Sequence, residues 1–68
     1  MEYIEKVQLN HFGDIISFQT NTGRIISYRK ALQEAENGLI QGAYVKNKRL
    51  YNEESGEEFH QFPLLDGE

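Results

Sequence analysis

Apolar and polar residues alternate along the first part of the chain, which is the pattern of half-buried β-strands. The segment YIEKVQL at residues 3–9 alternates imperfectly, and the interruption near Ile4 predicts a bulge in a first strand. DIISFQT at residues 14–20 predicts a second strand, and RIIS at residues 24–27 predicts a brief third strand. The short connections between them indicate antiparallel pairing.

Two polar segments with turn-forming residues separate these strands. NHFGD at residues 10–14 contains Asn10, which tolerates positive φ, and Gly13, which adopts it readily. NTG at residues 21–23 has the composition of a three-residue hairpin loop that ends in glycine. The first 27 residues therefore predict a meander of three strands.

A helix of about ten residues is predicted after the third strand. Ser27 precedes it as an N-cap, because its hydroxyl can accept a hydrogen bond from a free N–H group of the first turn. Gly38 follows Asn37 as a left-handed stop. One apolar stripe has helical spacing: Tyr28, Ala31, Leu32 and Ala35. A helix this short is stable only when such a stripe is buried, so we expect it to lie on the sheet.

The segment AYVKNKRLY predicts a second hairpin, with strands at residues 44–46 and 49–51. Its turn would be formed by Asn47 and Lys48, although a tight primed turn usually has glycine at the second position. The remaining residues start as an acidic run and then become apolar around Pro63, which makes a regular strand or helix unfavourable there.

These elements predict one α+β domain of order β-β-β-α-β-β, in which a single helix packs on a small, mainly antiparallel sheet. Residues 1–52 form the domain, and residues 53–68 form a C-terminal tail strapped onto it. The predicted core consists of Val7, Ile16, Phe18, Ile26, Ala31, Leu32, Ala35 and Val45.

The composition limits how such a domain is stabilised. A chain of 68 residues has room for one modest core, and it contains no cysteine, so disulfides are excluded. Two histidines without cysteine partners do not indicate a structural zinc site. We therefore expect the folded domain to be stabilised by packing alone or by pairing with a second copy of the chain. The absence of cysteine, of a signal sequence and of a membrane-spanning run predicts a cytoplasmic protein with no membrane partner.

The net charge of −4 is unevenly distributed. Residues 1–52 hold seven basic and five acidic residues, a net charge of +2, whereas residues 53–68 hold six acidic residues and no Lys or Arg, a net charge of −6. Four apolar residues follow the acidic run: Phe59, Phe62, Leu64 and Leu65. They are expected to cover an open face of the sheet and complete the core. The alternative is a partner-binding segment that becomes ordered only on contact.

Several short motifs resemble a small bacterial and phage family known as domain of unknown function 3892. They are FGDI, NTGR, the helix stop ENG, then IQGAYV and FHQFP, and the similarity spans roughly residues 4 to 63. The chain is shorter than the family pattern around KNKRLYNEESGE. The resemblance implies a compact α+β domain from a Gram-positive bacterium or its phage, and it implies no activity.

No arrangement of side chains predicts catalysis or the binding of a cofactor or metal. His11 and His60 lie far apart, and no serine or carboxylate completes a known triad or ligand motif around them. Glu34 and Glu36 are two positions apart on the predicted helix, so they point to different faces. The glycines are dispersed and form no phosphate loop. We expect a protein that is not an enzyme.

Two binding functions remain. The first, which we favour, is a protein-interaction or accessory regulatory module with a protein partner. The alternative is a weak nucleic-acid-binding module, because basic residues and aromatics that alternate on a ribbon can contact phosphates and stack on bases. Its candidate contacts are Arg24, Arg29, Lys30, Tyr44, Lys46, Lys48, Arg49 and Tyr51, screened by the acidic tail. The acidic net charge argues against it, since dedicated nucleic-acid binders are usually basic.

Overall fold

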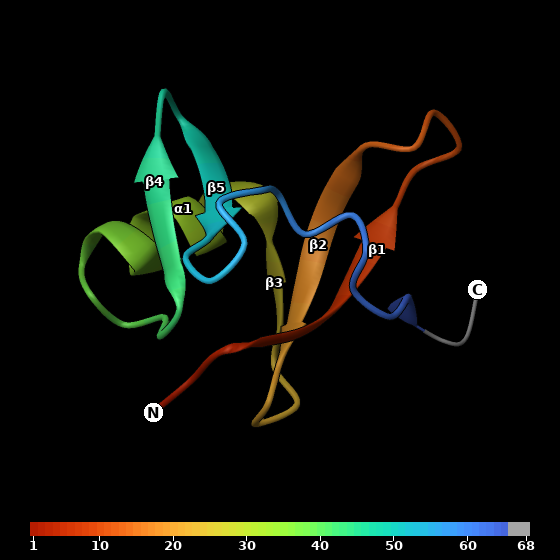
Figure 1. Cartoon of the computed structure of the whole chain (residues 1–68). Helices are drawn as coiled ribbons and strands as arrows, with labels where there is room; N and C mark the ends of the chain where they lie inside the picture. The colour runs from red at the N-terminus through yellow and green to blue at the C-terminus, as the bar shows by residue number, and fades with distance from the viewer. Residues whose placement is uncertain (66–68) are drawn as a thin grey trace.

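A computed structural model describes residues 1–65, and it confirms the α+β class and the predicted order of elements. The strands and the helix are β1 (Ile4–Leu9), β2 (Ile15–Thr20), β3 (Ile25–Ser27), α1 (Tyr28–Glu36), β4 (Ala43–Lys46) and β5 (Arg49–Asn52). They form two antiparallel sheets, β1-β2-β3 and β4-β5. Figure 1 shows the two sheets side by side, with α1 behind β4 and β5.

The first sheet is a meander with two bulges. Glu5 is the extra residue in β1, since Ile4 pairs with Thr20 and Lys6 with Gln19. This bulge confirms the irregularity predicted near Ile4, and it lets Ile4 and Val7 both face the core. The loop between β2 and β3 closes as the predicted three-residue turn, in which Gly23 has φ 90°.

A second bulge overturns the predicted inner face of β2. Gln8 pairs with Ser17 and Leu9 with Ile15, so Ile16 is left as an extra residue. The extra residue reverses the alternation at that point, and Ile15 becomes buried while Ile16 is 42% exposed. The inclusion of Ile16 in the predicted core was therefore wrong.

The two ends of α1 form as predicted. The Ser27 side chain accepts a hydrogen bond from the Lys30 N–H at 3.1 Å. At the other end Gly38 has φ 74°, its N–H donates to the Ala35 carbonyl, and the Leu39 N–H donates to the Glu34 carbonyl. These two bonds define a Schellman motif, which satisfies carbonyl groups that the helix leaves free.

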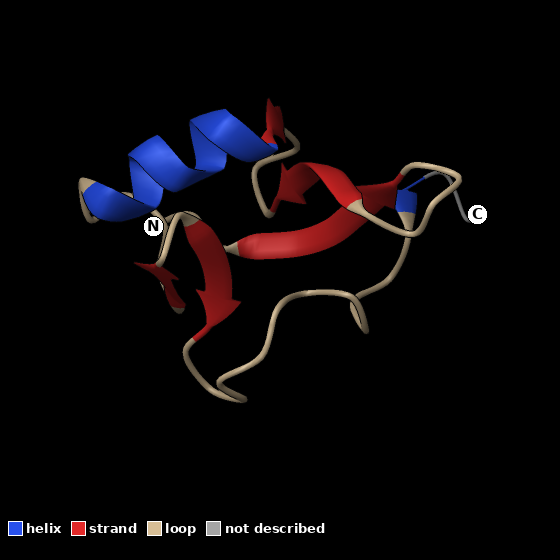
Figure 2. Ribbon diagram, turned by 90° about the horizontal axis from the view of Figure 1, so that it is seen from above, coloured by secondary structure: helices blue, strands red, loops and turns tan. Residues whose placement is uncertain are grey.

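The core lies between α1, the two sheets and the C-terminal segment. Its members are Ile4, Val7, Ile15, Phe18, Ile26, Ala31, Ile40, Leu50 and Phe59. Leu32, Ala35 and Val45 pack at its margin as half-buried residues. Figure 2 shows α1 on one side of the strands and the C-terminal segment crossing the other side.

The C-terminal segment packs through its apolar residues. Phe59 is 2% exposed, and its ring lies edge-on to those of Phe18 and Phe62, with centroids 5.7 and 4.8 Å away. The Val7 N–H donates to the Pro63 carbonyl at 3.0 Å, so this segment also pairs with the outer edge of β1. The acidic residues Asp66 and Glu68 of the predicted tail lie outside the described residues.

Candidate functional site

The β4–β5 hairpin turns one face toward α1 and one away from it. Asn47 and Lys48 form its turn, and both have positive φ, 52° and 63°. This is the type I′ geometry of a two-residue hairpin, formed here without glycine. The hairpin predicted from the sequence is thus confirmed, with each strand one residue longer: β4 starts at Ala43 and β5 ends at Asn52.

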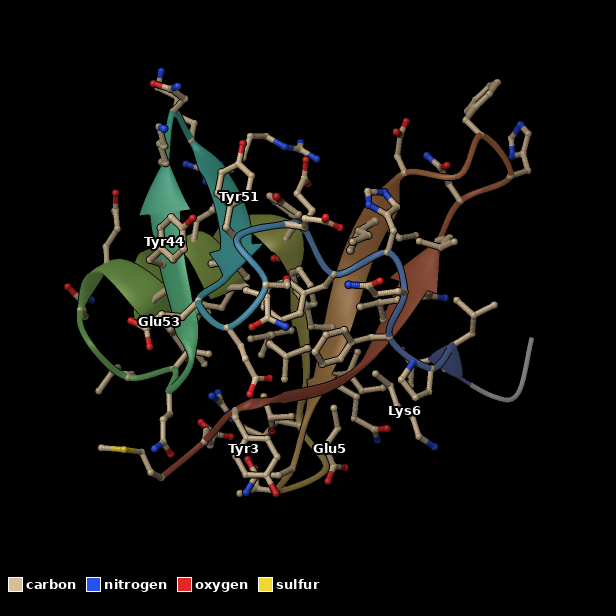
Figure 3. All side chains as sticks on the ribbon, viewed as in Figure 1. Tyr3, Glu5, Lys6, Tyr44, Tyr51 and Glu53 are labelled. Atoms are coloured by element: carbon tan, nitrogen blue, oxygen red, sulfur yellow. The ribbon has the colours of Figure 1, made fainter. Side chains whose placement is uncertain are left out.

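The outer face of the hairpin carries an ordered aromatic pair. Tyr44 lies opposite Tyr51, and their rings stack with centroids 5.6 Å apart and an interplanar angle of 26°. Lys46 lies opposite Arg49 nearer the turn, and Glu53 follows at the base. Figure 3 shows Tyr44, Tyr51 and Glu53 on this face. Because strand residues alternate, the face is basic at the turn, aromatic in the middle and acidic at the base.

The outer edge of β5 is closed by other parts of the chain. The Leu50 N–H donates to the Tyr28 hydroxyl at 2.8 Å. The Asn52 N–H donates to the Glu57 carbonyl, and the Gly56 N–H donates to the Asn52 carbonyl, both at 2.7 Å. Three of the four backbone groups on this edge are therefore occupied, and a further strand could not pair there.

The outer edge of β4 is open. In a two-residue hairpin the pair next to the turn is hydrogen-bonded, so Lys46 and Tyr44 direct their backbone groups to β5. Ala43 and Val45 direct theirs outward. Among residues 1–65, no backbone or side-chain group hydrogen-bonds to the outward N–H and C=O groups of these two residues. The β4 edge thus presents four unpaired groups in a row.

Arg24, one of the predicted nucleic-acid contacts, is held in a network of carboxylates and hydroxyls. Its guanidinium bonds to Glu2 at 2.5 Å and to the buried Glu34 at 2.6 Å. Glu2 also accepts hydrogen bonds from the hydroxyls of Thr20 and Thr22, at 2.9 and 2.6 Å. The two carboxylates raise the pKa of Arg24, so this cation is fixed within the domain.

Arg49, a second predicted contact, is also paired. It lies 2.7 Å from the Glu58 carboxylate and stacks over the Tyr28 ring, with its guanidinium carbon 4.7 Å from the centroid. The hydrogen bond to Glu58 raises the pKa of Arg49, and burial raises the pKa of Tyr28. This cluster joins β5, the start of α1 and the C-terminal segment.

The eight predicted nucleic-acid contacts do not gather at one place. Tyr44, Lys46, Lys48, Arg49 and Tyr51 share the hairpin, whereas Arg24 and Lys30 lie beside Glu34, with the Lys30 ammonium 4.0 Å from that carboxylate. Arg29 is exposed on α1. Lys46 and Lys48 are therefore the exposed cations nearest the tyrosine pair that have no ion pair among residues 1–65.

The four apolar residues of the tail are packed against the domain. Phe59 and Leu65 are buried, and Phe62 and Leu64 are half-buried, with Leu64 bridged to Val7. In this arrangement their apolar surface is turned toward the core.

A shallow hollow of about 580 Å³ lies at the base of the hairpin. It is lined by Tyr3, Gln41, Gly42, Asn52, Glu53 and Glu54. Its polar groups and two carboxylates would suit hydrogen bonding to a polar partner. Residues 1–65 hold no group of three His, Asp or Glu side chains that could bind a metal ion, and none of their helices is long and apolar enough to cross a membrane.

The residues that decide this arrangement could not be identified from the sequence. Glu2 and Glu34 neutralise Arg24, but nothing in their local pattern signals a contact across 22 and 10 positions. The alternation of AYVK shows the faces of β4, yet it does not show which edge lacks a neighbour.

The Glu2 network predicts a specific acid sensitivity. Hydrogen bonds, first from Arg24 and then from Thr22, lower the pKa of Glu2 from its ordinary value of 4.5 to about 2. A carboxyl whose folded pKa is lowered stabilises the fold above its unfolded pKa, and that stabilisation is lost as the pH falls through the folded pKa. Glu2→Gln should therefore flatten the decline of the melting temperature between about pH 4.5 and pH 2.

Glu5→Gln is the matched control, because Glu5 is exposed in the neighbouring strand β1 and the substitution removes the same charge. Its melting temperature should follow the wild-type decline with pH. Superimposable curves for wild type and Glu2→Gln would show that the network does not contribute to stability.

The model of a family described as "Protein of unknown function (DUF3892)" matches residues 3–60 of the chain. No curated protein and no solved structure matches the chain. The matched range includes all five strands and α1.

Proposed function

The chain belongs to the DUF3892 family of proteins of unknown function, and on that premise we propose that it is a non-enzymatic cytoplasmic module that binds an extended segment of a partner protein along the edge of β4. The cytoplasmic part of the proposal rests on the cysteine-free composition. The non-enzymatic part rests on the two distant histidines and the absence of a triad or ligand motif in the sequence.

One observation supports the binding mode above all, namely the contrast between the two edges of the hairpin. The β5 edge is occupied by Tyr28, Gly56 and Glu57, whereas the β4 edge presents the free groups of Ala43 and Val45. Natural proteins usually protect exposed edges. An edge left open beside one that is closed favours strand addition, in which backbone hydrogen bonds supply affinity and side-chain pockets supply specificity.

The tyrosine pair supports the same surface. Tyr44 is 37% exposed, and its stacking against Tyr51 holds both rings in place before a partner arrives. Tyrosines supply large contact areas at a low cost in conformational entropy, and they are enriched among residues that dominate binding energy. Cross-strand stabilisation of the hairpin would account for the stacking but not for the open edge.

The nucleic-acid alternative stays a prediction with weaker support. Arg24 and Arg49 already bond to carboxylates at 2.5 to 2.7 Å. Releasing them for a phosphate would break these ion pairs, which leaves Lys46 and Lys48 as the cations near the tyrosines. Retention on DNA that falls steeply with salt would favour this alternative.

The proposal is tested by selecting unstructured peptides from a display library on the immobilised chain and mapping each binder by NMR on the 15N-labelled protein. We expect the largest shifts at Ala43–Lys46, and slowed hydrogen exchange of the Val45 amide. Tyr44→Ala should weaken binding about tenfold or more. Phe12→Ala is the control, because Phe12 is also an aromatic residue and is 78% exposed but lies in the β1–β2 turn.

Peptides that change only the NMR chemical shifts of β3 or of the C-terminal segment would contradict the proposal. So would affinities that Tyr44→Ala leaves unchanged.

A further inference from the structure

We propose that the strand added to β4 is β4 of a second copy of this chain, which makes the protein a two-fold symmetric dimer with a continuous four-stranded sheet β5-β4-β4-β5. This inference rests on the proposed function, because it names the occupant of the same edge. It follows from the order of backbone groups and side chains along four residues.

The unpaired backbone N–H and C=O groups of β4 can pair with the same groups of β4 in a second copy. A two-fold axis that sets Tyr44 opposite the Tyr44 of a second copy also sets Ala43 opposite Val45 and Val45 opposite Ala43. Both of these pairs direct their backbone groups outward, so all four outward groups of each copy find a partner in four hydrogen bonds. An axis through Val45 would place Ala43 opposite the turn residue Asn47 of the other copy and make fewer bonds.

The aromatic pair also extends across this axis. Tyr44 opposite Tyr44 is a non-hydrogen-bonded pair, in which side chains approach most closely, with Cα atoms about 4.5 Å apart. Tyr51 stacks on the other side of each Tyr44 within its own copy. The dimer would therefore align four tyrosine rings across one face, and such aromatic pairs stabilise cross-strand contacts.

Lys46 of one copy and Glu53 of the other can form an ion pair that passes across Gly42. The same register sets Lys46 opposite Gly42 of the second copy, and Gly42 is joined to Glu53 by a hydrogen bond from the Glu53 N–H at 2.9 Å. Two strand spacings are about 9.6 Å, which the long side chains of Lys46 and Glu53 can span together. Gly42 has no side chain to block them. Two identical ion pairs would then flank the tyrosine row.

Within one copy these two residues cannot make this pair. Lys46 adjoins the hairpin turn and Glu53 follows the far end of β5, so the length of the hairpin separates them. A charge change at either position should therefore affect association without affecting the fold. Both side chains are exposed, which supports the same expectation.

The dimer should be weak and dependent on concentration. An edge of four residues makes a small interface, and contacts of this class have a Kd on the order of 0.1 to 1 mM. The test is therefore a dilution series of the full 15N-labelled chain from about 20 µM to about 2 mM. We expect the Ala43 and Val45 amides to shift and to exchange more slowly at the high end, where sedimentation should report an average mass that rises from that of the monomer toward twice that value.

Swapping the charges of Lys46 and Glu53 by mutation tests the register in which the two β4 strands pair. Lys46→Glu and Glu53→Lys each place two like-charge pairs across the axis, so each variant alone should stay monomeric at 2 mM. A mixture of the two restores both pairs with opposite charges, and the labelled Lys46→Glu chain should show the Ala43 and Val45 shifts again. Mixing Lys46→Glu with wild type is the control, because it restores only one of the two pairs.

Each outcome decides for or against the dimer. A wild-type chain that is monomeric throughout, shifts that map to another surface, or a mixture of variants that fails to associate would overturn it. If the chain is monomeric but peptides still bind at β4, the dimer is excluded and the proposed function stands. If neither a peptide nor a second copy binds at β4, both proposals fail.

Discussion

Phe18→Ala should destabilise the protein by about 3 to 5 kcal/mol, which is a large part of its total stability. Phe18 is fully buried in β2, and its ring lies 5.4 Å from that of Tyr28 and 5.7 Å from that of Phe59. Its removal opens a cavity where α1, the first sheet and the C-terminal segment meet. A domain of this size has only about 3 to 10 kcal/mol of stability in total.

The measurement is urea unfolding followed by circular dichroism, with Phe12→Ala as the matched control. Phe12 is 78% exposed in a turn, so the same substitution there should change the free energy of unfolding by less than about 0.5 kcal/mol. Equal unfolding curves for the two variants would mean that Phe18 does not organise the core.

Phe59→Ser should destabilise the protein by at least about 3 kcal/mol, because it removes a buried ring and places a hydroxyl in an apolar site. Phe59 is 2% exposed although it lies in a segment without regular secondary structure. A chain ending at residue 58 should behave similarly and also associate, since the apolar surface beneath Phe59 becomes exposed. Both effects would show that residues 53–65 complete the domain.

His60→Ser is the control for this substitution. His60 is the next residue, is exposed, and forms no hydrogen bond with residues 1–65, so its replacement should leave the melting temperature unchanged. A Phe59→Ser variant as stable as wild type would show instead that the segment is dispensable for folding.

Features with local causes could be predicted from the sequence. Ser27 and Gly38 mark the ends of α1 because each satisfies helix groups within a few residues. Gly23 marks the first hairpin loop for the same reason. The Asn47–Lys48 turn was also located correctly, although its second residue adopts positive φ without being glycine.

Features that depend on a distant partner could not be predicted in this way. Ile15 and Ile16 are both apolar, and only the bulge opposite Gln8 and Leu9 decides which of them faces inward. Arg24 has the pattern of a free surface cation, yet Glu2 and Glu34 occupy it. The candidate site could be predicted only to the level of an aromatic and basic hairpin.

The hydrogen bond from the Val7 N–H to the Pro63 carbonyl has a consequence during synthesis of the chain. Val7 belongs to β1, but its outer partner Pro63 is translated only after β5. Closing so long a loop costs entropy that is repaid only when both ends are present. Until residue 63 is available, the nascent β1 edge stays unpaired, and this interval is when a chaperone would contribute most to its yield.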